Sequence, residues 1–200
     1  MKTLKQHIFE KLKVSSKKEY AYTLFPQTKD ELKQIIEKEI SKKGNECSLN
    51  HIDVSKITNM SYMFYDSEFD GDISKWNVSN VTNMHGMFFH SVFNGDISDW
   101  DVSKVENMRY MFANSKFNGD ISNWDVSNVT KMSYMFDGCE SFNRPLNNWD
   151  VSNVKNMYYM FNECKSFNQD ISNWNVSNVI RTMFMFENCP IEEKYKPKFK

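Results

Sequence analysis

The sequence lacks two features that would place it in or across a membrane. No stretch reaches the roughly 20 apolar residues of a membrane-spanning helix, and residues 1–14 hold no unbroken apolar run of the length that a secretory signal requires. No cysteine near the start has a lipoprotein-type context. We therefore expect no membrane span and a chain that stays in the cytoplasm, where it is made.

Clustered basic residues are also missing from the middle of the chain. The formal net charge is −1, but residues 53–189 carry 10 Lys/Arg against 17 Asp/Glu, a net of −7, between two basic ends. Nucleic-acid grooves need clustered Lys and Arg because affinity for phosphate comes mainly from them. The sequence therefore predicts no DNA or RNA partner for this region.

What the sequence does contain is one phrase in six copies, Asp/Asn-Val-Ser-x-Val/Ile, at spacings of 24, 24, 24, 25 and 25 residues. The copies begin at Asp53, Asn77, Asp101, Asp125, Asp150 and Asn175. Self-similarity at this period indicates units that must each bury an apolar side against their neighbours.

Two apolar patterns in each copy predict its secondary structure. The form I-x-x-W-x-V, as at residues 73–78, matches the L-x-x-L-x-L phrase of leucine-rich repeats and favours a short strand that pairs in parallel with the next copy. The following apolar residues recur at i, i+3, i+6 and i+7, as in residues 81–88, which is typical of a helical face. We therefore predict an α/β repeat solenoid of leucine-rich-repeat type, with short parallel strands on one side and short helices on the other.

Large apolar side chains fill fixed columns of the repeat. Of the 13 Met, 11 lie in two columns, and Phe fills two more. The five Trp share one column: Trp76, Trp100, Trp124, Trp149 and Trp174. The same large side chain in every layer is expected of a packed core.

The segments outside the repeats predict a helical cap. Residues 3–14 have the spacing of a short amphipathic helix, and residues 20–24 give a weak strand signal that Pro26 ends. A capping box at residues 28–31, an apolar stripe and then Gly44 predict a helix over about residues 29–43, which would cover the open end of the first repeat.

Three parts of the chain follow from these patterns. Residues 1–48 would hold the N-terminal amphipathic helix, a linker and the capping helix, residues 49–189 the solenoid, and residues 190–200 a basic C-terminal tail.

The polar columns argue against catalysis. The Asp/Asn column could hold cations or sugar hydroxyls, but bonding to the backbone at a bend is the favoured interpretation. The Ser column should cap the helical stretch that follows it, as in the capping box at residues 103–106. No column joins a nucleophile, a base and an anion site, and the four histidines share no column. We expect no enzyme, no catalytic or metal-binding residues and no cofactor.

Three cysteines, Cys139, Cys164 and Cys189, occupy one column in which earlier copies have Ser. Neighbouring layers could bridge, but small thiols in a tight inward position explain the Ser/Cys exchange without a bond. We favour free thiols, with Cys47 alone near the cap; a zinc site is disfavoured because a C-x-x-C spacing is absent.

Variable positions beside the Met-Phe phrase are the candidate binding residues. They are Tyr62, Arg109, Tyr110, Tyr134, Tyr158 and Tyr159. Tyrosine suits an interface because it joins apolar area to a polar tip. These side chains could equally serve to half-cover the convex side of the solenoid.

The repeat resembles a known family. The run F-N-G-D-I-S-N-W-D-V-S-N-V-T-K-M-S-Y-M-F at residues 117–136 is similar to the BspA-like leucine-rich repeats, especially their mycoplasma-type surface lipoprotein branch, and the resemblance covers residues 49–189. It implies a surface-attached or secreted protein that acts in adhesion and protein binding. The chain departs from that family in lacking a signal peptide or anchor.

The sequence thus predicts a non-enzymatic module that binds a protein partner, and adhesion is one role that such binding could serve. A glycan is the less favoured ligand. The alternative is a phage-borne structural or cargo protein addressed to a virion by residues 1–14, which are weakly similar to address helices on internal proteins of tailed phages. A virion or the cell surface is then the alternative location to the cytoplasm.

Overall fold

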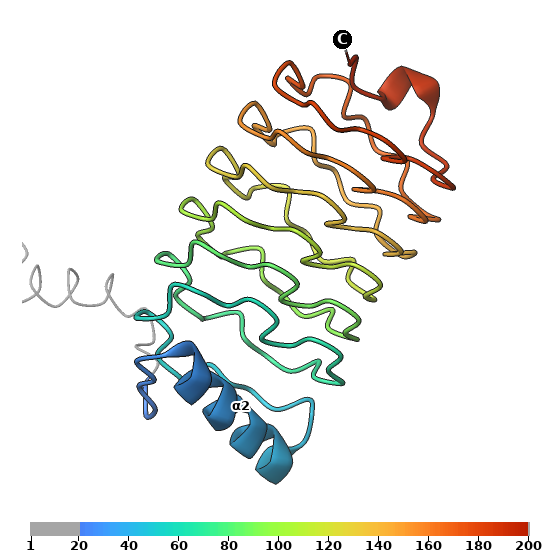
Figure 1. Ribbon diagram of the computed structural model, residues 1–200. Coiled ribbons are helices and arrows are strands. Elements are labelled where there is room, and N and C mark those ends of the chain that lie inside the picture. Colours follow the sequence, from blue (N-terminus) through green and yellow to red (C-terminus); the bar gives the residue numbers. More distant parts are fainter. Residues whose placement is uncertain (1–20, 200) are drawn as a thin grey trace, which may run out of the picture.

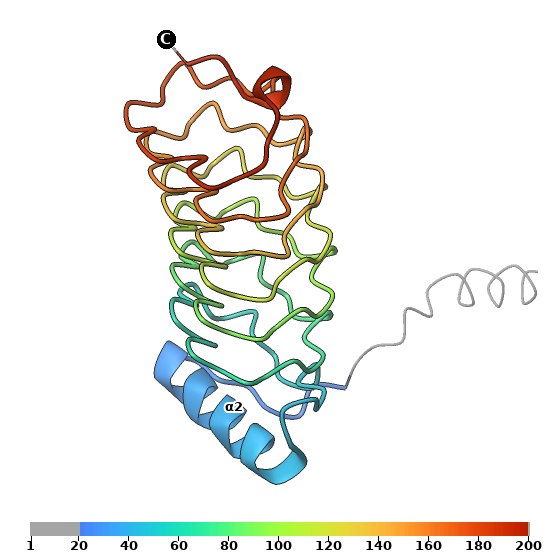
Figure 2. The ribbon, with the colours of Figure 1, turned by 90° about the vertical axis from the view of Figure 1, so that its right-hand side faces the viewer.

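The computed structural model describes residues 21–199 and shows a stack of similar turns with a helix across one end (Figure 1). α2 (Lys29–Lys43) lies at the N-terminal end of the stack, and a short 3-10 helix, η1 (Glu193–Tyr195), lies at the other. Turned by 90°, the ribbon shows turns of similar outline one above another (Figure 2). The helix predicted over residues 3–14 lies outside the described residues.

α2 begins and ends where the sequence predicts. The Thr28 hydroxyl accepts a hydrogen bond from the Glu31 N–H at 3.2 Å, and Gly44, at φ 85°, donates its N–H to the Ile40 carbonyl at 2.8 Å. Leu32 and Ile36 are buried in the same apolar cluster as the repeats. The helix therefore closes the core at this end, and the weak strand signal before it amounts to a single parallel bridge between Leu24 and Ile52.

The predicted α/β repeat solenoid is wrong. Between α2 and η1 the described chain forms neither helices nor strands, and neighbouring turns share one isolated parallel bridge each. These bridges join the column Asn59, Asn83, Asn107, Lys131, Asn156 and Arg181. Each turn is a succession of tight turns, so it is not a leucine-rich-repeat unit with a strand side and a helix side.

The apolar spacing misled because a β-turn, like a turn of helix, brings residues i and i+3 together. In the Met-Phe segment, Met63 N–H bonds to Met60 O and Tyr65 N–H to Tyr62 O, within the turn. The alternate N–H groups of Met60, Tyr62, Phe64 and Asp66 instead donate to carbonyls of the next turn at 2.8–2.9 Å. In a helix all these N–H groups would bond within the segment. Here every second N–H group bonds to the next turn instead.

Two residues in each of the six turns hold the left-handed conformation that this pattern needs. They lie four positions apart: 62 and 66, 86 and 90, 110 and 114, 134 and 138, 159 and 163, and 184 and 188, all with φ between 51° and 65°. Glycine fills only two of these twelve positions, Gly86 and Gly138. The other ten residues adopt the left-handed backbone conformation against the usual preference of L-residues. Contacts between turns must therefore stabilise that conformation.

Identical aromatic rings pack layer on layer in the core. Successive rings of one Phe column lie 5.4–5.8 Å apart and within 14° of parallel. That column is Phe64, Phe88, Phe112, Phe136, Phe161 and Phe186. Each Trp is 3–4% exposed, and its indole N–H reaches a backbone carbonyl of the preceding turn, as Trp124 does at Ile97 O, 3.1 Å away. The Trp column therefore satisfies its polar atom while it fills the core.

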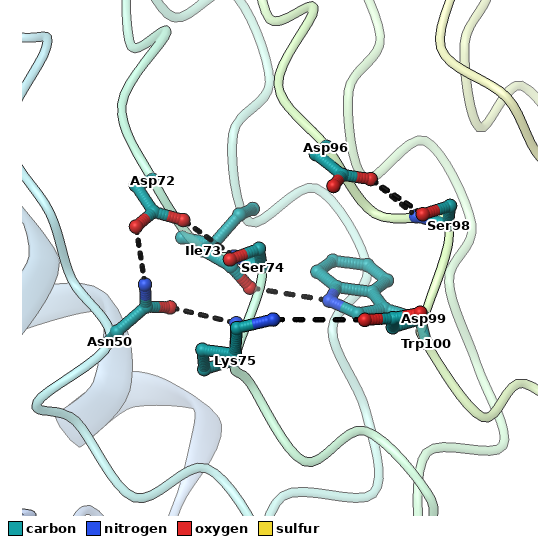
Figure 3. A network of polar contacts seen from close by, with 9 residues as sticks. All are labelled: Asn50, Asp72, Ile73, Ser74, Lys75, Asp96, Ser98, Asp99 and Trp100. Carbon is teal, nitrogen blue, oxygen red and sulfur yellow. Dashed lines mark hydrogen bonds and ion pairs between the residues drawn. The ribbon is translucent and has the colours of Figure 1, made fainter. Parts of the chain in front are cut away.

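Asx turns bend the chain at the outside of every layer. In all six copies of the Asp/Asn column a side-chain oxygen accepts the N–H of the Ser two residues later, which is the local bonding favoured from sequence. The predicted capping role of that Ser is wrong, because no helix follows it. A second set of such bends includes Asp72 with Ser74 and Asp96 with Ser98, seen beside the Trp100–Ile73 bond in Figure 3.

One column of side chains bonds directly to the backbone of the next layer. The Oδ1 of Asp70 accepts the Asn94 N–H at 2.7 Å, and the same bond repeats at 2.8–3.1 Å up to Glu192. The accepting side chains are those of Asp70, Asn94, Asn118, Asn143 and Asn168, and the last donor is the Glu192 N–H. These side-chain bonds fix the register between turns at positions where the backbone N–H groups do not bond to backbone carbonyls of a neighbouring turn.

Trp124→Ala should destabilise the protein by roughly 3–5 kcal/mol, because it removes a buried indole and its bond to Ile97 O. Denaturant melts followed by circular dichroism measure the change. The matched control is the exposed neighbour Asn123→Ala, expected within about 0.5 kcal/mol of wild type. Equal melts for the two variants would contradict the packing described here.

Stability should fall in acid through the Asx turns. Hydrogen bonds from Ser103 lower the pKa of Asp101, and those from Ser152 lower the pKa of Asp150. Because these folded-state values lie below the unfolded value of about 4, the stabilisation is present above that pH and is lost as the pH falls through the folded values.

Asp101→Asn with Asp150→Asn keeps the accepting oxygen, as Asn77 and Asn175 do at equivalent positions. Urea melts at pH 6.5 and pH 3 should show a smaller loss of stability in this variant than in wild type. An unchanged loss would mean that these two carboxylates do not contribute to acid sensitivity.

Candidate functional site

A row of aromatic side chains runs along one outer face, from the first turn to the last. Its members are Tyr62, His85, Tyr110, Tyr134, Tyr159 and Phe184, and adjacent ring centroids lie 4.4–5.8 Å apart. Tyr110 and Tyr134 stack at 9°, and Tyr134 and Tyr159 at 3°. We call this set the aromatic row.

The row exists because position 62 and its equivalents are left-handed. A residue in that conformation is followed by a buried Met, as Tyr110 is followed by Met111. In the second turn this place is Gly86, where a Cβ atom would lie 2.5 Å from the Tyr62 ring. His85 continues the row there, and its Nε2 lies 2.6 Å from the Tyr62 hydroxyl.

An open groove of about 700 Å³ lies beside the C-terminal half of the row. Its lining residues are Arg109, Tyr110, Ser133, Tyr134, Asn156, Tyr158, Ile180, Arg181, Thr182 and Met183. The groove combines tyrosine rings and apolar side chains with two guanidinium groups, and none of its lining residues within 21–199 is acidic. Such a mixture is typical of binding sites.

The groove region is electropositive within an acidic repeat array. Partial burial and then the charges of Arg109 and Lys131 lower the pKa of His85. Among residues 21–199, neither arginine of the groove nor Lys131 has a carboxylate within ion-pair distance. Burial, with Tyr110 and Tyr158 nearby, raises the pKa of Tyr134, so its hydroxyl stays protonated at neutral pH.

The structure gathers the candidate binding residues at this face. Tyr62, Tyr110, Tyr134 and Tyr159 belong to the aromatic row, Tyr158 packs edgewise on Tyr134 at 5.4 Å, and Arg109 lines the groove. Tyr62, in the first turn, is not among the groove residues. Sequence reasoning missed Arg181, although it breaks a column in which four of six copies have Asn. It also missed Ser133, whose identity carries no signal without the groove.

The cysteine column is packed inward. All four cysteines are free, and the Cys139 and Cys164 thiols donate to the carbonyls of Phe117 and Phe136 at 3.2 and 2.9 Å. Burial raises the pKa of Cys139 to about 12 and raises that of Cys164 as well. Within residues 21–199 no group of three or more His, Cys, Asp or Glu side chains is placed to hold a metal ion.

Comparison with known proteins decides the family. A family model described as a Mycoplasma protein of unknown function, DUF285, matches residues 31–117 and again residues 113–197. The chain belongs to the DUF285 family. No curated protein and no solved structure matches it.

Membership of the DUF285 family agrees with the mycoplasma-type part of the resemblance noted from sequence, and not specifically with its BspA-like leucine-rich part. Two successive matches also agree with a repeated chain. In the part of the chain that the structure describes, no helix is both long and apolar enough to cross a bilayer.

The buried thiols should be unreactive in the native protein. Alkylation by iodoacetamide at pH 8 should label Cys47 and the half-buried Cys189 well before Cys139 and Cys164, which should react only after unfolding, because the thiolate is the nucleophile and burial disfavours it. Peptide mass spectrometry identifies the labelled sites. Rapid native labelling of Cys139, or a bridge between Cys139 and Cys164, would contradict this packing.

Proposed function

We propose that this DUF285 protein is a non-enzymatic binding module and that the aromatic row with its groove is the binding surface for a protein partner. The observation that carries the proposal is the groove itself, about 700 Å³ lined by stacked tyrosines and by two arginines that have no carboxylate partner among residues 21–199. Tyr and Arg are the residues most enriched among those that dominate interface energies. The proposal includes the absence of a catalytic role.

The alternation of fixed and variable positions supports the same function. Core columns repeat the same side chain in nearly every turn, whereas one column that lines the groove has a different residue in each of its four turns: Arg109, Ser133, Tyr158 and Met183. Variation of this kind lets one scaffold present a specific surface. The adhesive role implied by the BspA-like resemblance would use this surface, with a glycan as the second class of ligand.

A triple variant tests the surface with little effect on the fold. Arg109→Ala, Tyr110→Gly and Tyr134→Gly remove the centre of the groove, and glycine suits both tyrosine positions because Gly86 occupies the equivalent place. The control variant changes three exposed residues elsewhere: Tyr22→Ala, Phe25→Ala and Lys116→Ala. Thermal melts of both variants show that they remain folded.

Immobilised wild type, triple variant and control are exposed to proteins of the source cell and its surroundings, and to a glycan array. The proposal predicts a bound protein, identified by mass spectrometry and then purified, whose affinity falls at least about tenfold in the triple variant and is unchanged in the control. A partner that the triple variant retains, and that deletion of residues 1–14 abolishes, would favour the cargo or virion alternative. Binding to glycans alone would replace the protein partner by a sugar.

A further inference from the structure

The last turn presents a row of backbone donors without acceptors. In the fifth turn, four alternate N–H groups donate to carbonyls of the sixth at 2.9–3.2 Å, from Met157, Tyr159, Phe161 and Glu163. The equivalent groups of the sixth turn have no acceptor among residues 21–199; they belong to Thr182, Phe184, Phe186 and Asn188. We call these four groups the donor edge.

The donor edge fits the carbonyl groups of another polypeptide segment. Inside the stack, the acceptors for such a row are the carbonyls of alternate residues in one neighbouring segment, here 181, 183, 185 and 187 for the fifth turn. Unpaired edges of this kind are templates for an added segment of chain, whose main-chain bonds supply affinity.

The donor edge continues into the groove. Thr182 lines both the groove and a second hollow of about 390 Å³, which runs past Phe184 and Phe186 to Phe199. Ile180 is 78% exposed, Met183 61% and Phe184 42%, and the last two are more exposed than the half-buried Tyr158 and Tyr159 at the same positions of the preceding turn. Exposed apolar area beside unused donors indicates a surface that a ligand covers.

The positive charge of the groove favours a negatively charged ligand. Arg109 and Arg181 line it, and both lack a carboxylate partner among the described residues. The Ser133 hydroxyl and the Arg109 Nε are buried there without a hydrogen-bond partner in the described part of the chain, and Ser133 is only 1% exposed. Unpaired buried polar groups are costly, and an acidic side chain drawn to the two guanidinium groups would form charge-assisted bonds.

We propose that the donor edge and the groove together bind an acidic polypeptide segment of a partner protein. Its alternate carbonyls accept from the donor edge, its apolar side chains cover Met183 and Phe184, and a Glu or Asp side chain enters the groove between Arg109 and Arg181. This inference rests on the proposed function and names the chemistry of the partner.

Two other occupants fit less well. A second copy stacked head to tail would meet α2, which lies across the N-terminal end of the stack (Figure 1). An acidic glycan could reach the arginines, but it offers no row of carbonyls with the spacing of a polypeptide. Of the three, only a peptide satisfies the donors and the charges at once.

A display library of random 12-residue peptides, screened on the immobilised full-length protein, tests the inference. The recovered peptides should be enriched in Asp and Glu, and synthetic copies should bind at least about tenfold more weakly to the Arg109→Gln, Arg181→Gln variant. The control variant, Lys56→Gln with Lys116→Gln, removes the same charge at exposed sites outside the groove and should bind like wild type.

Amide exchange measured by NMR tests the backbone part. Addition of a recovered peptide should slow exchange at residues 182, 184, 186 and 188, and should leave residues 185 and 187, already bonded within the turn, little changed. Added salt should weaken binding, because the recognised group is charged.

Several results would overturn the inference. Recovered peptides that are neutral or basic, or that bind both arginine and lysine variants equally, would exclude the acidic ligand. Binding without slowed exchange at the donor edge would exclude the backbone contact. No recovered peptide, with or without binding of sulfated or sialylated glycans, would exclude the peptide occupant. None of these results depends on the triple variant, whose failure to lose a captured partner would instead contradict the binding surface as a whole.

Discussion

Each Met-Phe segment divides its backbone N–H groups between two directions, and the architecture depends on that division. Every second group bonds within the turn, as Met63 does to Met60, and the others bond to the next turn, as Met60 does to Asn83. Such alternation requires left-handed residues at regular places, and these turn the side chain of residue 62 and its equivalents outward. The core columns and the exposed aromatic row are thus two results of one hydrogen-bond pattern.

The sequence predicts the ends and the contents of the core better than the conformation of the turns. α2 follows from local signals, a Thr cap, an apolar stripe and Gly44, each of which acts within a few residues. The Met-Phe segment does not, because a three-residue apolar spacing suits a helix and a run of β-turns equally. The run of β-turns differs from a helix in its left-handed residues. Glycine signals that conformation at Gly86 and Gly138, but most of the equivalent positions hold Tyr, Asp or Asn, from which it cannot be read.

The candidate site was predictable in kind but not in shape. Variation between copies singled out Arg109 and the tyrosines as candidate surface residues, and stacking places these tyrosines in contact across turns. The groove depends in addition on Arg181 and on the exposed apolar residues of the last turn, such as Met183. Those side chains become accessible because no described turn follows them, a property of the assembled stack that no single repeat encodes.

The direction of the inter-turn hydrogen bonds has a mechanical consequence. They run along the stack, and the described chain enters beside α2 and leaves at the opposite end, near η1 (Figure 1). A tension applied between these ends loads the bonds lengthwise, one layer at a time, so the coil yields by peeling from an end rather than by shearing as a whole. Each step releases one repeat of 24 or 25 residues, roughly 80 Å of extended chain at about 3.3 Å per residue, and the protein therefore extends under load as a series of equal increments.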